Sequence, residues 1–327
     1  MIKKLCAALA LGLGMVGAFA QDINFGILST EATQNLKGDW QPLIDDMSRQ
    51  TGLKVTAFFA PDYAGIIEAM RFNKVQLGWF GNKSAMEAVD RASGEVFAQM
   101  VNADGTQGYY SHLIVNRASP INTLDDVLKN AKNLSFGNGD PNSTSGYLVP
   151  GFYVFAQNKV DAKTAFRVTR SANHETNALA VANKQIDVAT NNSENLEKVK
   201  ERFPEKFKDI KIVWTSPLIP LDPLVMRKDL PEATKTKLKN FFLNYAKTDA
   251  REKEIVMKIS KLSGFKESSD KQLMPIRQLD LFGQRNKIEA RYRAERRRQE
   301  DAPGRHRQEA VRAQLSADRP PCRPRFR

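Results

Sequence analysis

Apolar and polar residues alternate along this chain in short blocks, and the blocks switch between the two-residue period of a strand and the 3.6-residue period of a helix. Strands are predicted at 23–28, 54–59, 75–80, 96–102, 112–116, 134–137, 186–189 and 210–214. Helices are predicted at 40–50, 66–72, 84–92, 124–130, 178–183, 194–202 and 231–245. Strands that alternate with helices predict a parallel α/β architecture.

Two of these blocks recur at one spacing. Residues 24–26 (NFG) correspond to 135–137 (SFG), and residues 75–78 (VQLG) correspond to 186–189 (IDVA), in both cases 111 residues later. The blocks at 75–78 and 186–189 both follow a predicted helix and precede a polar turn. The shared spacing predicts two lobes of the same topology, and the alternative is a chance similarity between α/β units.

The same spacing relates Tyr63 to His174, and each residue stands at the head of a predicted helix. In open α/β sheets, ligands bind beyond the carboxyl ends of the strands, where loops lead into helices. If the two lobes face each other, Tyr63 and His174 reach one cleft from opposite sides. The alternatives are a half-buried tyrosine with a solvated hydroxyl and a surface or capping histidine.

Three consecutive hydroxyl residues, which we call the hydroxyl triplet (Ser143, Thr144 and Ser145), follow the Gly-, Asn- and Pro-rich turn at 137–142. They stand where a helix would begin, and a helix start offers unpaired N–H groups to an anion. No Lys or Arg lies between residues 134 and 157, so neutral dipoles would hold the anion. The alternative is an ordinary serine cap. Pro150 is expected to kink or restart the helix.

The net charge of +13 is concentrated at the end of the chain, because residues 283–327 hold 14 Lys and Arg but only 6 Asp and Glu. Residues 21–282 are nearly neutral, which gives no case for nucleic-acid binding. The two cysteines, Cys6 and Cys322, lie outside this region, and the chain has three histidines. We therefore expect no metal site and no disulfide within residues 21–282.

Residues 1–20 have the pattern of a secretory signal peptide. Lys3 and Lys4 precede an apolar run at 5–16, and Ala18-Phe19-Ala20 forms a cleavage signal. The apolar run is shorter than the roughly 20 residues that a membrane span needs. We expect the mature protein to begin at residue 21, to be exported to the periplasm and to be soluble.

Several segments together resemble the periplasmic phosphonate-binding proteins of ABC transporters, almost continuously over residues 21–282. These segments are 58–67 (FFAPDYAGII), 137–146 (GNGDPNSTSG), 174–180 (HETNALA), 191–196 (NNSENL), 216–220 (SPLIP) and 275–279 (PIRQL). The resemblance implies a two-lobed α/β fold of the periplasmic binding protein type, type II-like, with a two-stranded hinge. It divides the chain into the first part of lobe 1 (21–115), lobe 2 (116–215) and a return to lobe 1 (216–282). It also implies a non-catalytic transport protein without a cofactor, which delivers a phosphonate to a membrane permease.

The resemblance assigns two groups of ligand contacts. The phosphonate oxygens would be held by Tyr63, Ser143, Thr144, Ser145 and His174. The amino group of 2-aminoethylphosphonate, the implied preferred ligand, would be held by the carboxyl pair (Glu194 and Asp222) with Tyr109 lining the pocket, although Tyr110 is adjacent. The alternatives are a helix-start acid for Glu194 and an Asp-Pro turn for Asp222.

The chain departs from the family pattern in residues 283–327, which are rich in Arg and Pro. A frameshifted reading of the gene and a natural basic tail both fit, and we expect a disordered segment or a solvated helix. The alternative function is an exported hydrolase that uses a Ser143/His174/Asp222 triad on phosphate or ester substrates. Ser143 lacks the Gly-x-Ser-x-Gly setting of many such nucleophiles.

Overall fold

The computed structural model describes residues 22–300, so the predicted signal peptide and residues 301–327 of the predicted tail lie outside the described residues. The chain divides into one compact unit that ends at Arg277 and a second that begins at Gln278. Helix α11 (Met274–Glu300) starts in the first unit and provides the described part of the second. The predicted tail is therefore helical from residue 283 to residue 300.

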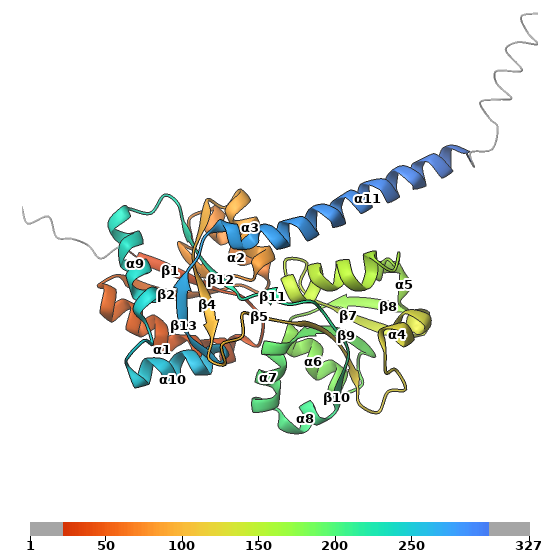
Figure 1. The fold of residues 1–327 in the computed structure, drawn as a ribbon, viewed down its shortest axis with the longest axis horizontal. Coiled ribbons are helices and arrows are strands. Elements are labelled where there is room, and N and C mark those ends of the chain that lie inside the picture. The colour runs from red at the N-terminus through yellow and green to blue at the C-terminus, as the bar shows by residue number, and fades with distance from the viewer. Residues whose placement is uncertain (1–21, 301–327) are drawn as a thin grey trace, which may run out of the picture. The chain divides into compact units, whose positions relative to one another are not determined.

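The first lobe is built on a six-stranded sheet with the order β13-β4-β12-β3-β1-β2 (Figure 1). Its strands are β1 (Asp22–Ile27), β2 (Lys54–Phe59), β3 (Leu77–Trp79), β4 (Gly94–Asn102), β12 (Pro223–Arg227) and β13 (Leu262–Glu267). Its helices are α1 (Thr33–Thr51), α2 (Tyr63–Arg71), α3 (Asn82–Arg91), α9 (Glu232–Asn244), α10 (Ala250–Ser260) and the short η4 (Asp270–Leu273).

The second lobe is built on a five-stranded sheet with the order β10-β6-β9-β7-β8. Its strands are β6 (Ser111–Asn116), β7 (Ser135–Asn138), β8 (Val168–Ser171), β9 (Val188–Asn192) and β10 (Ile210–Thr215). Its helices are α4 (Leu124–Asn130), η1 (Ala131–Asn133), η2 (Thr144–Leu148), η3 (Gly151–Ala156), α5 (Ala162–Ala165), α6 (His174–Ala182), α7 (Ser193–Arg202) and α8 (Pro204–Lys208).

A two-stranded ribbon connects the lobes, with β5 (Gly108–Tyr109) antiparallel to β11 (Ile219–Pro220). Gly108 is required here, because a Cβ at this position would collide with the Ile219 carbonyl oxygen. The chain thus leaves the first lobe at β5, and β6 already belongs to the second sheet. The expected boundary at residue 115 placed this strand in lobe 1, and the sheet pairing corrects it.

The predicted repeat is confirmed by the sheet register. In the first lobe, β1 pairs in parallel with β2 and β3, and Phe25 stands opposite Leu77. In the second, β7 pairs in parallel with β8 and β9, and Phe136 stands opposite Val188. Both members of the second pair lie 111 residues after their counterparts. Each parallel trio is then extended by an antiparallel strand, β12 or β6.

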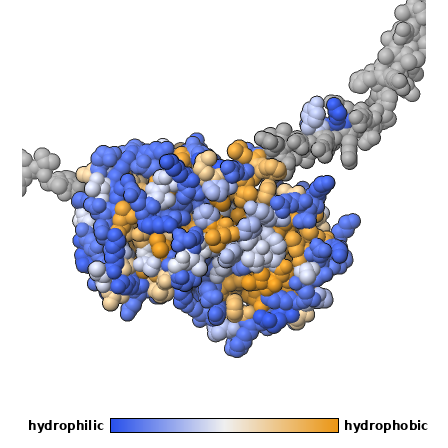
Figure 2. All heavy atoms as spheres, in the orientation of Figure 1, coloured by the Kyte–Doolittle hydropathy of each residue, from blue (hydrophilic) through white to orange (hydrophobic). Residues whose placement is uncertain are grey.

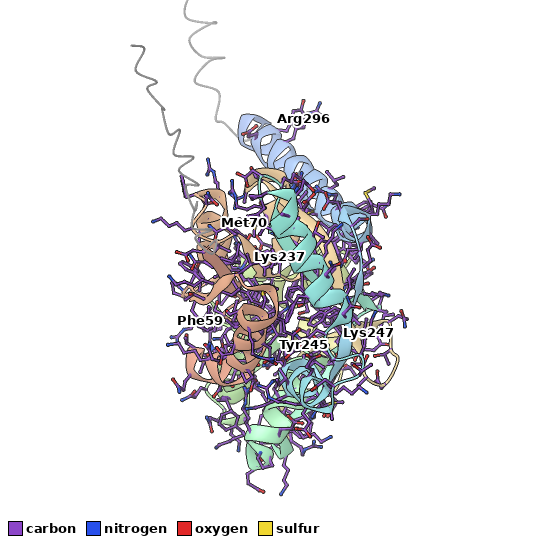
Figure 3. The ribbon with its side chains drawn as sticks, turned by 90° about the vertical axis from the view of Figure 1, so that its left-hand side faces the viewer. Phe59, Met70, Lys237, Tyr245, Lys247 and Arg296 are labelled. Atoms are coloured by element: carbon purple, nitrogen blue, oxygen red, sulfur yellow. The ribbon has the colours of Figure 1, made fainter. Side chains whose placement is uncertain are left out.

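The apolar core follows the same layering. In the first lobe, Phe25 packs edge-on against Trp40 and Phe242, with ring centroids 5.5 and 6.2 Å apart. Tyr245 lies at the end of α9 (Figure 3), and its hydroxyl donates to the Asp46 carboxylate at 2.8 Å. In the second lobe, neighbouring residues of β6 face opposite sides of the sheet and enter two separate apolar clusters. Each lobe therefore has its own apolar core.

Two local expectations differ in detail. Residues 29–31 are expected to open a helix ahead of the one at 40–50, and the structure instead has one continuous helix, α1, from Thr33 to Thr51. Buried Leu36 extends the apolar face of Trp40 and Leu43 toward the helix start. The helix after the hydroxyl triplet continues through Pro150 and does not restart there. Its backbone bonds span five residues, as from the Leu148 N–H to the Ser143 carbonyl. Such wide turns are frequent at functional sites.

The visible face carries hydrophilic residues over most of its rim, with hydrophobic residues gathered between them (Figure 2). Within residues 22–300, we find no helix with both the length and the apolar character needed to cross a membrane.

Candidate functional site

A cavity that is partly open to solvent lies between the two lobes beside the hinge ribbon. All eight residues predicted to contact ligand line this cavity: Tyr63, Tyr109, Ser143, Thr144, Ser145, His174, Glu194 and Asp222. Of the two adjacent tyrosines, Tyr109 is 4% exposed and lines the cavity, whereas Tyr110 is 40% exposed and does not.

The hydroxyl triplet forms the first end of the cavity, at the start of η2, and all three side chains are buried. Each hydroxyl oxygen accepts a hydrogen bond from the protein, which leaves its own O–H free to donate into the cavity. The donors are the Gly146 N–H to Ser143 (3.0 Å), the Lys83 N–H to Thr144 (2.8 Å) and the Asn192 side-chain amide to Ser145 (3.0 Å). The bond from Lys83 crosses from lobe 1 to lobe 2.

His174 is the first residue of α6, which Asn173 caps. Its Nε2 lies 3.5 Å from the Ser143 hydroxyl and 3.3 Å from the side-chain amide nitrogen of Asn192. Because that amide donates to Nε2, the ring proton is assigned to Nδ1, which is buried and has no protein partner. Burial lowers the pKa of His174 to about 4, so the ring is neutral at physiological pH.

Tyr63 is the first residue of α2, which Asp62 caps, so it holds the place in lobe 1 that His174 holds in lobe 2. Its backbone N–H donates to the Asp140 carboxylate of lobe 2 at 3.1 Å. Burial raises the pKa of the Tyr63 phenol, and the nearby Asp140 and Asp222 raise it further, while a hydrogen bond with Ser143 opposes them. The phenol therefore remains a neutral hydrogen-bond donor.

Asp222 stands between β11 and β12 and begins the second, acidic end of the cavity. Its Oδ2 accepts a hydrogen bond from the Trp79 indole at 2.9 Å, while its Oδ1 is buried without a partner. Burial raises the pKa of Asp222 to about 7, against the opposing hydrogen bonds from Trp79 and Tyr109.

Glu194 lies in the first turn of α7 and completes the carboxyl pair. Burial raises its pKa to about 8, Asp222 raises it further, and Lys198 opposes the shift. Burial likewise raises the pKa of the Tyr109 phenol, reinforced by Asp222 and then Glu194. The acidic end thus holds two carboxyl groups that disfavour each other's ionisation.

Ionic contacts join the lobes next to the cavity. Lys198 of α7 binds the Asp39 carboxylate at 2.6 Å and the Lys258 carbonyl at 2.6 Å, both in lobe 1. Arg202, one turn further along α7, binds Asp39 and Glu31. The Lys198 ammonium is therefore already paired with groups of lobe 1, and its single charge does not neutralise the carboxyl pair.

The residues of the hydrolase alternative do not form a working triad. His174 Nδ1 has no partner, and Asp222 is bonded to Trp79, so no carboxylate orients the imidazole. Within residues 22–300, no group of three or more His, Cys, Asp and Glu side chains is placed to hold a metal ion.

Sequence reasoning missed two residues that hold the predicted ones in place. Asn192 links Ser145 to His174, and Trp79 holds Asp222. Thr30 and Asn195 also line the cavity, and their buried side-chain polar atoms have no partner. The repeat offered one signal, because Asn192 lies 111 residues after the turn residue Gly81, which lines the same cavity. No local pattern marked Trp79.

Comparison with known proteins identifies the family. Residues 25–273 match the family described as "ABC transporter, phosphonate, periplasmic substrate-binding protein". The phosphonates-binding periplasmic protein of Escherichia coli K12 is 62% identical over 260 residues, which cover 80% of this chain and 76% of that protein.

Solved structures agree with this assignment. A binding protein component of an ABC phosphonate transporter from Pseudomonas aeruginosa superposes with a TM-score of 0.81 at 57% identity, covering 83% of this chain and 89% of that one. A Prochlorococcus marinus protein in complex with methylphosphonate shares the fold, with a TM-score of 0.71 at 23% identity over 79% of this chain and 97% of that one. These relatives are binding proteins, which removes the ground for the hydrolase alternative. The chain belongs to the family of periplasmic substrate-binding proteins of phosphonate ABC transporters.

Proposed function

We propose that this protein binds 2-aminoethylphosphonate in the cavity between its lobes, in preference to alkylphosphonates without an amine. One observation carries the proposal: the same cavity is lined by a set of neutral donors and by two carboxyl groups. The ligand is a zwitterion with a phosphonate two carbons from an ammonium group, so its two charges match these two sets of groups.

The phosphonate would lie at the hydroxyl triplet. Its oxygens would accept hydrogen bonds from the three hydroxyls, from the Tyr63 phenol and from His174. The protons of the three hydroxyls can be donated to the phosphonate, because each hydroxyl oxygen already accepts a bond from the protein. Neutral donors held in place in this way bind an anion without first having to be ordered, which favours affinity.

The ammonium would lie at the carboxyl pair. Two like charges about 4 Å apart cost roughly 4 kcal/mol at an effective dielectric of 20, so a site for a phosphonate alone would gain nothing from two nearby acids. An ammonium placed between the phosphonate and the carboxylates attracts both of them, and these two attractions offset the repulsion. Asp222 Oδ1, buried without a partner, supports this position for the amine.

We further propose that ligand binding closes the lobes over the cavity. Tyr63 belongs to lobe 1 and the hydroxyl triplet to lobe 2, so one phosphonate in contact with both would shift an open population to a closed one. Small-angle scattering with and without 2-aminoethylphosphonate should show a smaller radius of gyration in the bound state. An unchanged radius at saturating ligand would contradict closure.

Export and delivery complete the proposal. The signal-peptide pattern at residues 1–20 and the family membership support a periplasmic location, and a membrane permease of an ABC transporter would receive the ligand.

The test is isothermal titration calorimetry of the wild-type protein against 2-aminoethylphosphonate, methylphosphonate and inorganic phosphate. We expect the amine-bearing ligand to bind at least about tenfold more tightly than methylphosphonate, since one ion pair of about 1.4 kcal/mol gives that factor. Equal affinity for both phosphonates would show that the carboxyl pair is structural.

A further inference from the structure

Buried polar atoms without a partner are concentrated at the cavity. Among the described residues, six side-chain atoms are buried and unpaired, and five of them belong to residues that line it. A buried polar group left without a hydrogen bond is costly, so such a concentration indicates groups that await a ligand. His174 and Asp222 already have places in the proposed function, but Thr30 and Asn195 do not.

Asn195 is the stronger of these two signals. It is 5% exposed, lines the cavity, and neither its amide nitrogen nor its amide oxygen has a partner. Its backbone N–H is used separately, because it donates to the Asn192 side chain at 2.7 Å as part of the cap of α7. The free amide therefore has no role in holding the helix.

Thr30 lies on the opposite side of the lobe interface. Its carbonyl accepts a bond from the Glu175 N–H of lobe 2 at 3.3 Å, which fixes the loop after β1 against α6, while its hydroxyl is buried and unpaired.

Helical periodicity relates the two residues. Asn195, Lys198 and Arg202 follow one another at spacings of three and four residues and so share one face of α7. Arg202 on this face binds Glu31, the neighbour of Thr30. Arg202 thus brings α7 against the loop that carries Thr30, and Thr30 and Asn195 both line the cavity. Of the three residues on this face of α7, Asn195 alone has a side chain without a partner.

The chemistry of this pair restricts what it can hold. An amide and a hydroxyl each donate and accept, and neither carries a charge. Lys198 and Arg202 are committed to carboxylates, and Glu31, Asp39 and the carboxyl pair also line the cavity. A second anionic group on the ligand would be repelled there, whereas a neutral group that both donates and accepts would satisfy both side chains.

We propose that Thr30 and Asn195 form a third subsite, which takes a hydroxyl oxygen, and that aminoalkylphosphonates with a hydroxyl on the carbon chain are therefore ligands of this protein. With the unsubstituted ligand, a water molecule fills the subsite. This inference rests on the proposed function. On a two-carbon chain the stable position for the hydroxyl is carbon 1, because a hydroxyl beside the amine would eliminate ammonia.

The experiment compares three kinds of ligand by calorimetry: 2-aminoethylphosphonate, the two enantiomers of its 1-hydroxy derivative, and the two enantiomers of the analogue with a methyl group in place of the hydroxyl. In the wild type, one hydroxy enantiomer should bind within about threefold of the parent and at least about tenfold more tightly than either enantiomer of the methyl analogue. In Asn195→Leu and in Thr30→Val, this preference for hydroxyl over methyl should fall by about fivefold or more, with the parent affinity changed by less than about threefold.

Thr190→Val is the matched control, because the Thr190 hydroxyl is also buried and unpaired but does not line the cavity. It should leave all of these affinities unchanged. If Asn195→Leu does not fold, Thr30→Val decides the question. Equal binding of hydroxyl and methyl analogues by the wild type overturns the subsite, as does a preference that survives in Thr30→Val. Equal weakening of parent and hydroxy ligand in Asn195→Leu also overturns it, because it places the amide on the ammonium. Failure of the wild type to bind the parent would instead refute the proposed function.

Discussion

The two ends of the cavity are polar in opposite ways. At the hydroxyl triplet, every side-chain oxygen is fixed by a hydrogen bond from the protein, and the groups are neutral over the whole physiological pH range. At the carboxyl pair, one oxygen of Asp222 has no partner, and burial holds both pKa values near or above 7. The first end is preorganised and insensitive to pH, while burial holds the second end short of its full negative charge.

This contrast separates affinity from selectivity. The neutral end should bind the group that all phosphonates share, and the acidic end should distinguish among ligands by what is attached to that group. Changes at each end should therefore have different signatures across a set of ligands.

The largest expected effect comes from removal of two hydroxyls of the neutral end. Each hydrogen bond to a charged group contributes about 1.5–3 kcal/mol, so Ser143→Ala combined with Thr144→Val should weaken binding by about 10²- to 10⁴-fold. Calorimetry should show a similar loss for 2-aminoethylphosphonate and methylphosphonate. Near-native affinity in a folded double variant would remove the triplet from the site.

A smaller and selective effect is expected at the acidic end. Glu194→Gln and Asp222→Asn should each weaken 2-aminoethylphosphonate by about 10- to 100-fold, since each removes one ion pair with the ammonium. Methylphosphonate should bind as well as before or better, because a repelling charge is gone. Glu197→Gln, an exposed site on the same helix, is the control and should change neither affinity. A parallel loss for both ligands would contradict the assignment.

The pH dependence should sharpen the same contrast. In the empty cavity, Asp222 and Glu194 have pKa values of about 7 and about 8, so both are largely protonated at pH 6. The ammonium needs them ionised, so its binding releases protons, and affinity must fall as pH falls. The affinities of 2-aminoethylphosphonate and methylphosphonate are first corrected for the titration of each free phosphonate, because the ammonium lowers the pKa of the phosphonate that carries it; their ratio then reports the carboxyl pair. From pH 8 to pH 6 this ratio should drop by about tenfold; a constant ratio would show that the pair does not titrate with binding.

The smallest effect is expected far from both ends. Ile276, at the start of α11, is buried in the first unit, and the second unit begins at Gln278. Truncation after Phe282 keeps this anchor, so we expect all ligand affinities to remain within about twofold. Circular dichroism should show that the shortened protein is folded; an unfolded product would mean that residues beyond 282 are needed for stability.

The sequence alone determined the features that depend on neighbouring residues. The 111-residue repeat predicted the matched registers of Phe25 with Leu77 and of Phe136 with Val188. Periodicity predicted the helix at 124–130, and the structure begins it with a capping box between Thr123 and Asp126. The turn before the hydroxyl triplet predicted a helix start, and the structure has one there, with the three hydroxyls buried. Periods and caps act over a few residues, so a single sequence is enough to reveal them.

Only the tertiary structure decided which residues meet across long separations. Strand β6 belongs to the second sheet because it pairs with β9 and β10. Local periodicity predicts a strand but does not say which strands it pairs with. Successive residues of a strand point to opposite sides, so only the packed hinge could select Tyr109 over Tyr110. The bond from Trp79 to Asp222 joins residues 143 positions apart. The free amide of Asn195 is visible only once every nearby partner has been placed, because an unmet hydrogen bond is a property of the whole neighbourhood and not of the residue.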